Sequence, residues 1–429
     1  MRKRFVFRGC FLALGACAAY TLFLTGCGSS GGKEASSPTG GQTSGGGSVA
    51  AGGTSGSGNG LGGAAGALVR PPDPCVLGGC PPGVWVDVTP PGVDLVNGAC
   101  GNYGTKSVQA DPRHPQDLYT LFFCQGVWKS SDYGQTWKGP INTGASGSVF
   151  GDCAGGITIP PNSASDSPTL YASCIRGAGL GFWRSTNGGV DWTHLTTPDG
   201  SGQQYYPPTV DPYDPKHLLM PGHGVDFLIE SSDGGDTWNV IKTDPGMAQA
   251  GGTGEIAFID NGDPAATRKT WLWLGAASGG KVGTWRSADA GATWTKVETN
   301  EHINGSTQVY QPDTKGVIFM AGVYSALGWG VLRSEDYGKT WAHVGLTAQE
   351  TVVFGTSRFL YALYGWGQPA DVTLEVSPLP GTGTWTSPGT PAAMTLGPAQ
   401  AAVTNDGTAN IVVLANFNGG VWRYLEPTQ

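Results

Sequence analysis

Basic residues are scarce in this chain of 429 residues. It has 24 Lys and Arg against 32 Asp and Glu, a formal net charge of −8 at pH 7. Nucleic-acid binding needs clustered Lys and Arg that neutralise phosphates, so this balance argues against a nucleic-acid partner. It argues more weakly against anionic membranes and polyanionic substrates. The first 26 residues hold four positive charges and no acid, so without them the net charge changes from −8 to −12.

Several common catalytic signatures are also missing. The sequence has no nucleophile-elbow serine, no HExxH and no phosphate-binding glycine loop in the structural context that each requires. No histidine lies at metal-ligand spacing near the cysteines, so we expect no metal site and no cofactor. The 72 glycines are interpreted as turn and linker glycines.

The chain does contain one repeated motif, Ser-x-Asp-x-Gly-x-Thr-Trp, in four full copies and one degenerate copy with Asn187 for Asp and Asp191 for Thr. The copies are Ser130–Trp137, Ser185–Trp192, Ser231–Trp238, Ser287–Trp294 and Ser334–Trp341. Their third positions are Asp132, Asn187, Asp233, Asp289 and Asp336, spaced by 55, 46, 56 and 47 residues. A period near 50 with one turn motif per unit is typical of β-propeller blades.

Each copy has the composition of a hairpin turn. The Asp or Asn side chain can accept backbone N–H bonds within the turn, and Gly supplies positive φ without a Cβ clash. The Trp can bury a large ring between sheets. Because every copy repeats this role, we interpret the Asp, Gly and Trp residues as structural rather than catalytic.

The blade count predicts an all-β, seven-bladed propeller over residues 70–429. Five box-bearing units are followed by a sixth from Glu350 to Trp385 and a seventh that ends in Gly419–Tyr424. The last unit lacks a fourth strand, and Gly83–Thr89 resembles one. We therefore expect the N-terminal strand to pair with the last blade, which closes the ring and removes its open edges.

The repeats resemble the Asp-boxes, or BNR repeats, of sialidases, xyloglucanases, sortilin-type receptors and photosystem II assembly factors. Asp-Pro turns at Ala110–Tyr119 and Val210–Leu219 are most similar to the xyloglucanase branch. Sialidases are disfavoured because the chain has no Arg-Ile-Pro, and Arg184, Arg286, Arg333 and Arg423 occupy a repeat position, so no arginine triad is found. Xyloglucanases place their cleft between two propellers, whereas this chain has one, and it lacks the Arg-Thr-Asp-x-Gly-Gly pattern.

The N-terminus predicts export and lipid anchoring. Residues 1–26 read as a signal peptide, basic and then apolar, that ends in the lipobox-like Leu24-Thr25-Gly26-Cys27. Cys27 would become the lipidated first residue; the alternatives are an ordinary secretory signal or a membrane helix. Gly28 after it resembles sorted lipoproteins of the outer membrane or cell surface. Residues 27–69, rich in Gly and Ser, form a flexible linker.

Six cysteines follow the lipobox, an even number that suggests disulfides in an exported protein. Cys100 and Cys124 occupy places in blade one that Cys153 and Cys174 occupy in blade two. Each pair falls before a first strand and at the end of the second, so we predict both bridges. A third, Cys75–Cys80, would close a small local loop.

The family resemblance places active sites on the face opposite the box turns, around the central axis. Glycoside hydrolysis needs two carboxyl groups about 5–9.5 Å apart. Asp152 and Asp226 are the first candidate pair, with Glu255 next; the alternative is that each caps a turn or pairs with a nearby cation. Candidate carbohydrate contacts on this face are Trp366, Trp329, Tyr324, Tyr205, His223 and Arg176. The tryptophans could equally pack a loop, and His223 could be a structural hydrogen-bonding residue.

Two functions follow from these residues. One is glycoside-hydrolase-like action on a neutral polysaccharide; the other is non-catalytic binding of a glycan or a protein by a rigid platform. In both, we expect a monomer whose contact with the membrane is its lipid anchor.

Overall fold

The computed structural model describes residues 80–95, 103–163, 166–198, 204–222, 227–242, 255–275, 283–299, 309–321, 330–346, 352–364 and 372–428. The predicted signal peptide, Cys27 and the linker lie outside these ranges. No helix in the described ranges is long and apolar enough to cross a membrane.

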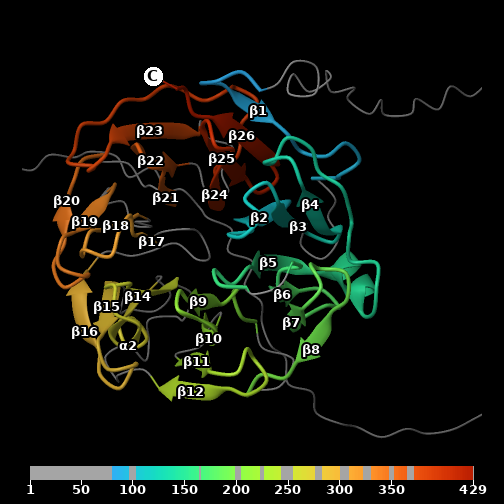
Figure 1. The fold of residues 1–429 in the computed structure, drawn as a ribbon, viewed down its shortest axis with the longest axis horizontal. Coiled ribbons are helices and arrows are strands. Elements are labelled where there is room, and N and C mark those ends of the chain that lie inside the picture. The colour runs from blue at the N-terminus through green and yellow to red at the C-terminus, as the bar shows by residue number, and fades with distance from the viewer. Residues whose placement is uncertain are drawn as a thin grey trace, which may run out of the picture. The chain divides into compact units, whose positions relative to one another are not determined.

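Seven antiparallel sheets stand in a ring (Figure 1), which confirms the seven-bladed β-propeller. Blade one consists of β2 (Thr105–Ala110), β3 (Leu118–Phe122) and β4 (Gly126–Ser130). Blade two consists of β5 (Ala154–Thr158), β6 (Leu170–Arg176), β7 (Gly181–Ser185) and β8 (Thr193–Leu195). Blade three consists of β9 (Thr209–Asp211), β10 (Asp214–Pro221), β11 (Phe227–Ser231) and β12 (Asn239–Lys242). Blade four consists of β13 (Ile256–Phe258), β14 (Trp271–Gly275), β15 (Gly283–Ser287) and β16 (Thr295–Glu298). Blade five consists of β17 (Val309–Tyr310), β18 (Ile318–Met320), β19 (Leu332–Ser334) and β20 (Ala342–His343). Blade six is β21 (Val352–Gly355), β22 (Phe359–Tyr364) and β23 (Thr373–Pro378), and blade seven begins with β24 (Gln400–Asn405), β25 (Asn410–Ala415) and β26 (Val421–Leu425).

The N-terminal strand closes the ring as predicted. β1 (Trp85–Asp87) pairs antiparallel with β26, with Trp85 opposite Tyr424 and Asp87 opposite Trp422. Blade seven therefore has the order β1-β26-β25-β24, with the first described strand of the chain at its outer edge. Closure gives the last blade a partner for its third strand, so that strand is not left as an exposed edge.

The depth at which each strand of a blade is buried accounts for its apolar or polar composition. The second strands are packed between neighbouring sheets, so β3 and β25 are buried along their whole length and consist almost entirely of apolar residues. The outer strands β8 and β20 carry exposed polar residues. First strands of adjacent blades, such as β24, β2 and β5, contact one another at the inside of the ring. Side chains of the first strands thus surround the central axis.

One predicted disulfide lies wholly within the described residues. Cys153, just before β5, is bonded to Cys174 in β6, with the two Cα atoms 5.2 Å apart. Cys80 and Cys124 are also disulfide-bonded. Their predicted partners, Cys75 and Cys100, lie outside the described residues, so those two pairings stay predictions.

Candidate functional site

The box turns use their polar groups internally. In the third box, Ser231 Oγ donates to Asp233 Oδ1 at 2.8 Å, and Gly235 N donates to Ser231 Oγ at 2.8 Å. Thr237 donates to the same carboxylate from its backbone N at 2.9 Å and from its hydroxyl at 2.6 Å. The boxes at Asp132, Asp289 and Asp336 repeat these bonds. These carboxylates hold the turn together.

The pKa of Asp233 reflects that network. Partial burial alone would raise it, but the hydrogen bonds from Thr237 and Ser231 favour the ionised form and lower the pKa to about 2. The pKa of Asp289 and that of Asp336 are lowered for the same reason. A carboxylate that is ionised and satisfied within its own turn is poorly suited to proton transfer.

The second box keeps the geometry with different residues. Asn187 Oδ1 accepts from Asp191 N at 2.9 Å, and Asn187 Nδ2 donates to Asp191 Oδ2 at 2.7 Å. Donor and acceptor are exchanged relative to the Asp–Thr pair, so the bond is preserved. The other carboxylate oxygen of Asp191 accepts from Ala145 N at 2.6 Å. The substituted pair thus also ties down the link between β4 and β5.

The arginines at the repeat position connect blades. Arg184 Nη1 donates to the carbonyl of Gly234 at 3.0 Å, and Arg286 Nε donates to the carbonyl of Tyr337 at 2.7 Å. Each acceptor lies in the box turn of the following blade. Arg423 closes the circle by donating to the carbonyl of Tyr133 in the first box at 2.9 Å. These bonds give the arginines a structural role, so their presence in the repeat does not indicate a site for an anionic ligand.

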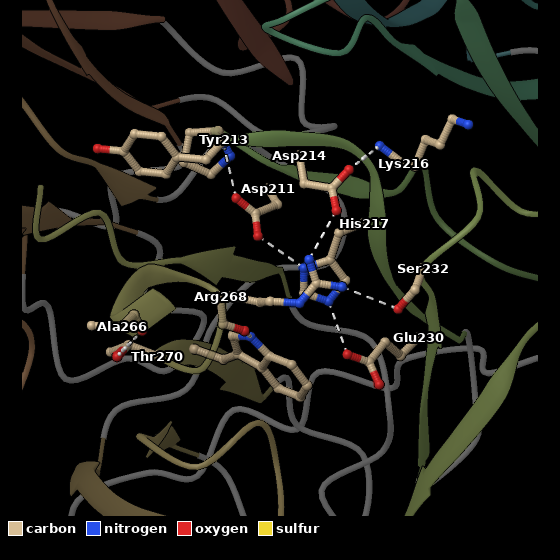
Figure 2. A network of polar contacts seen from close by, with 12 residues as sticks. Asp211, Tyr213, Asp214, Lys216, His217, Glu230, Ser232, Ala266, Arg268 and Thr270 are labelled. Carbon is tan, nitrogen blue, oxygen red and sulfur yellow. Dashed lines mark hydrogen bonds and ion pairs between the residues drawn. The ribbon is translucent and has the colours of Figure 1, made fainter. Parts of the chain in front are cut away.

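A polar network with catalytic-looking residues lies where blades three and four meet. Figure 2 shows His217 between two carboxylates, with Nδ1 2.9 Å from Asp211 Oδ2 and Nε2 2.8 Å from Glu230 Oε1. Arg268, just after α2 (Pro264–Thr267), donates to Asp214 at 2.8 Å. The side chain of His217 is fully buried. The ion pair of Arg268 with Asp214 joins two blades. Because His217 has no exposed surface and both its ring nitrogens are bonded to carboxylates, His217 itself is not accessible to a substrate.

Described residues of the first strands line a cavity at the centre of the ring. It has a volume of about 300 Å³ and is lined mainly by first strands and the residues just before them. Its polar lining includes Lys106 and Gln109 of β2, Gln400 of β24, Tyr206 before β9 and Glu255 before β13. Pro207, Pro208 and Ile256 supply apolar walls. Thr158 of β5 and Ile175 of β6 complete the lining, so blades one, two, three, four and seven contribute side chains to one cavity.

Lys106 is the cation of this cavity. Its Nζ lies 5.4 Å from the centroid of the Tyr206 ring and 5.7 Å from that of Phe417, within the range of cation–π attraction. Burial, aided by the positive charge of Arg176, lowers the pKa of Lys106 to about 8. Burial also raises the pKa of Tyr206, so the phenol stays neutral near neutral pH.

The predicted site residues fall in different places. Glu255 lines the cavity. Asp152 accepts a hydrogen bond from Ala178 N at 2.8 Å, the turn-capping alternative for that residue, and does not line the cavity. Tyr205 has a buried ring, while the adjacent Tyr206 reaches the cavity. Arg176 is exposed and donates to the hydroxyl of Tyr103 at 3.0 Å.

Five predicted residues lie outside the described part of the chain: Asp226, His223, Tyr324, Trp329 and Trp366. Their roles stay predictions, as does the assignment of a catalytic pair.

Sequence reasoning missed Lys106, Gln109 and Gln400. All three lie within first strands, whereas the site was expected at strand entries and in the links between strands. The pairing of β2 with β3 shifts register between Thr105 and Val108, and this irregularity changes which side chains of β2 face the axis. A long polar side chain within a first strand is the signal that would have identified them, because first strands surround the central axis.

Comparisons with known proteins agree with this architecture. The BNR-Asp box repeat family model matches residues 332–344. The chain is similar to xyloglucanase Xgh74A of Acetivibrio thermocellus, at 27% identity over 177 residues, covering 33% of this chain and 20% of the relative. A xyloglucanase of a Paenibacillus species is 27% identical over 219 residues, covering 43% of this chain and 20% of the relative. These matches thus cover about a fifth of the length of the curated relatives.

Solved structures share the fold. The GH74 xyloglucanase of Xanthomonas campestris aligns with a TM-score of 0.56 at 16% identity, covering 79% of this chain and 53% of that one. YCF48 bound to a D1 peptide aligns with a TM-score of 0.52 at 13% identity, covering 80% of this chain and 97% of that one. The seven-bladed ring, its box turns and these matches show that the chain is an Asp-box, or BNR-repeat, β-propeller with xyloglucanase-like repeats.

Proposed function

We propose that this propeller acts on polysaccharide as a glycoside hydrolase and that its central cavity holds the sugar. The observation that carries the proposal is the cavity itself, where Glu255 shares about 300 Å³ with the amides of Gln109 and Gln400 and the ring of Tyr206. Amides satisfy sugar hydroxyls, aromatic rings stack on sugar faces, and a carboxyl group can transfer a proton to a glycosidic oxygen. The similarity to two xyloglucanases supports the same substrate class.

Hydrolysis needs a second carboxyl group. Asp152 is engaged in its turn by Ala178 N, which favours Asp226 as the partner of Glu255. The second group would serve as base or nucleophile while the first protonates the leaving oxygen.

The test is release of reducing sugar from a panel of neutral polysaccharides, xyloglucan among them, by the purified full-length chain. Glu255→Gln and Asp226→Asn should each reduce the rate by a hundredfold or more, because each removes a proton-transfer or nucleophilic group. Asp152→Asn keeps an oxygen that can accept from Ala178 N and serves as the matched control. Release of sugar that survives Glu255→Gln would remove Glu255 from the mechanism.

The second candidate function is a non-catalytic platform that binds a glycan or a protein. It is favoured by the placement of Asp152, since Glu255 is the one predicted carboxylate found in the cavity among the described residues. Binding of polysaccharide without any release of sugar, unchanged by Glu255→Gln, would establish this alternative.

We also propose that the chain is exported and anchored by a lipid on Cys27, at the outer membrane or cell surface. The motif Leu24-Thr25-Gly26-Cys27 and the glycine-rich stretch after it support the proposal. Metabolic labelling with a fatty acid tests it: the wild type should incorporate label, and Cys27→Ala should not. A labelled Cys27→Ala variant would contradict the anchor.

A further inference from the structure

Lys106 stands in the central cavity without an anionic partner among the described residues. Its described neighbours are the rings of Tyr206 and Phe417, at 5.4 and 5.7 Å from Nζ, and the like charge of Arg176. An ammonium group has three donors and loses solvation when it is partly buried. Aromatic rings offset part of that loss but accept no strong hydrogen bond. The described residues therefore leave Lys106 able to bind an anion.

The backbone beside the lysine is also unusual. Phe417 has a φ of 45°, in the left-handed region that bulky residues rarely adopt. Its carbonyl accepts from Thr105 N at 3.2 Å, and a Cβ on Gly104 would lie 2.1 Å from that carbonyl oxygen. The turn after β25 is thus held tightly against the start of β2. Strained residues of this kind persist where the surroundings impose them, and they cluster at ligand sites.

We propose that the cavity binds a single carboxylate-bearing sugar residue, of the uronic acid type, with its carboxylate against Lys106; this rests on the proposed function, because it takes the occupant to be a sugar. Gln400 Oε1 already accepts from Val108 N at 2.9 Å, so its amide group is left to donate.

The size and charge of the site limit its occupant. A volume of about 300 Å³ is at the lower end for small-molecule pockets and suits a short sugar segment. The net charge of −8 repels a polyanion at long range, but one carboxylate meets the local field of Lys106 and Arg176. The ligand is therefore acidic at one position rather than along its whole length.

The experiment is isothermal titration of the full-length chain with methyl galacturonoside, which carries one carboxylate, and with its methyl ester, which has the same ring without the charge. A charge-assisted hydrogen bond predicts that the acid binds about ten- to a hundredfold more tightly than the ester. Lys106→Met should remove that preference and leave the affinity for the ester unchanged. Lys106→Arg should retain it, which distinguishes a lost charge from a damaged fold.

The pH dependence gives a second signature. Among the described residues, the titratable groups near Lys106 are Glu255 and Tyr206 of the cavity and Arg176, while the flanking strands β5 and β24 carry none. Tyr119 on the paired strand β3 lies near Lys129. The wild-type preference for the acid should fall as pH rises through about 8, where Lys106 loses its proton. The Lys106→Arg variant should show no such fall.

Equal affinity for acid and ester in the wild type would overturn the inference, and so would a preference that survives Lys106→Met. If a neutral xyloglucan oligosaccharide still binds in that case, the proposed function stands without the inference. If no sugar binds at all, both are wrong.

Discussion

In the box turns, charged groups are bound by residues two or four positions away, whereas in the central cavity they meet side chains from other blades. Asp233 receives its bonds from Ser231 and Thr237 in the same turn. Lys106 of blade one instead faces Tyr206 of blade three and Phe417 of blade seven. The first arrangement is local and repeated; the second depends on closure of the ring and occurs once. We infer that the repeated residues build the propeller and the unrepeated ones give it specificity.

The largest expected effect on stability comes from removing a box tryptophan, which tests whether the repeated residues build the propeller. Trp192 is 3% exposed and packs on Phe150 with ring centroids 4.4 Å apart. Trp192→Ala should cost about 3–5 kcal/mol of unfolding free energy, because it leaves a large cavity between blades one and two. Urea unfolding measures it. A loss below 1 kcal/mol would mean that the box Trp is not a structural anchor.

The degenerate box offers a double-mutant cycle. Asn187→Asp alone would set two carboxylates against each other, since Asn187 Nδ2 now donates to Asp191 at 2.7 Å. Asp191→Thr alone removes the acceptor, and the double variant restores the consensus pair while losing the bond from Ala145 N. We expect a favourable coupling of about 2 kcal/mol from urea unfolding. Additive effects would show that the exchanged donor and acceptor do not matter.

The repeat arginines allow a matched comparison of smaller effect. Arg423 donates across to the first box, whereas Arg333 is ion-paired with Glu335 in its own turn and precedes the blade without a standard box. Arg423→Met should cost about 1–3 kcal/mol because it leaves the partly buried carbonyl of Tyr133 without this donor. Arg333→Met should cost less than about 1 kcal/mol, because its partner Glu335 is exposed and solvent weakens the ion pair. Equal losses would contradict the role of the arginine as a link between blades.

The smallest effect is on the pH dependence of stability. Burial lowers the pKa of His217, but hydrogen bonds to Asp211 and Glu230 outweigh it and leave the pKa raised. The stabilisation is fully present below the unfolded value of about 6.5 and is lost as pH rises through the folded pKa. The Tm of the wild type should therefore fall over that interval relative to His217→Gln. Parallel Tm profiles would show that His217 is not charged in the folded chain.

The sequence predicted what depends on local repetition. The box turns, the Asp-Pro links, the pairing of β1 with β26 and the Cys153–Cys174 bridge follow from motifs whose partners are fixed by the period. Lys106 and Gln400 could not be predicted in the same way. Their neighbours come from other blades, and a shift of register in β2 decides which side chains face the axis. Of the predicted catalytic carboxylates, Glu255 alone is found in the cavity among the described residues.

The most direct test of whether the cavity carries function and the boxes carry stability compares Glu255→Gln with Asp289→Asn for both sugar release and Tm. Glu255 lines the cavity, and Asp289 is bound by Ser287 and Thr293 in its own turn. We predict that Glu255→Gln loses activity at an unchanged Tm and that Asp289→Asn lowers Tm at an unchanged kcat/KM. Loss of activity in a folded Asp289→Asn variant, with full activity in Glu255→Gln, would place the function at the box turns and contradict the account.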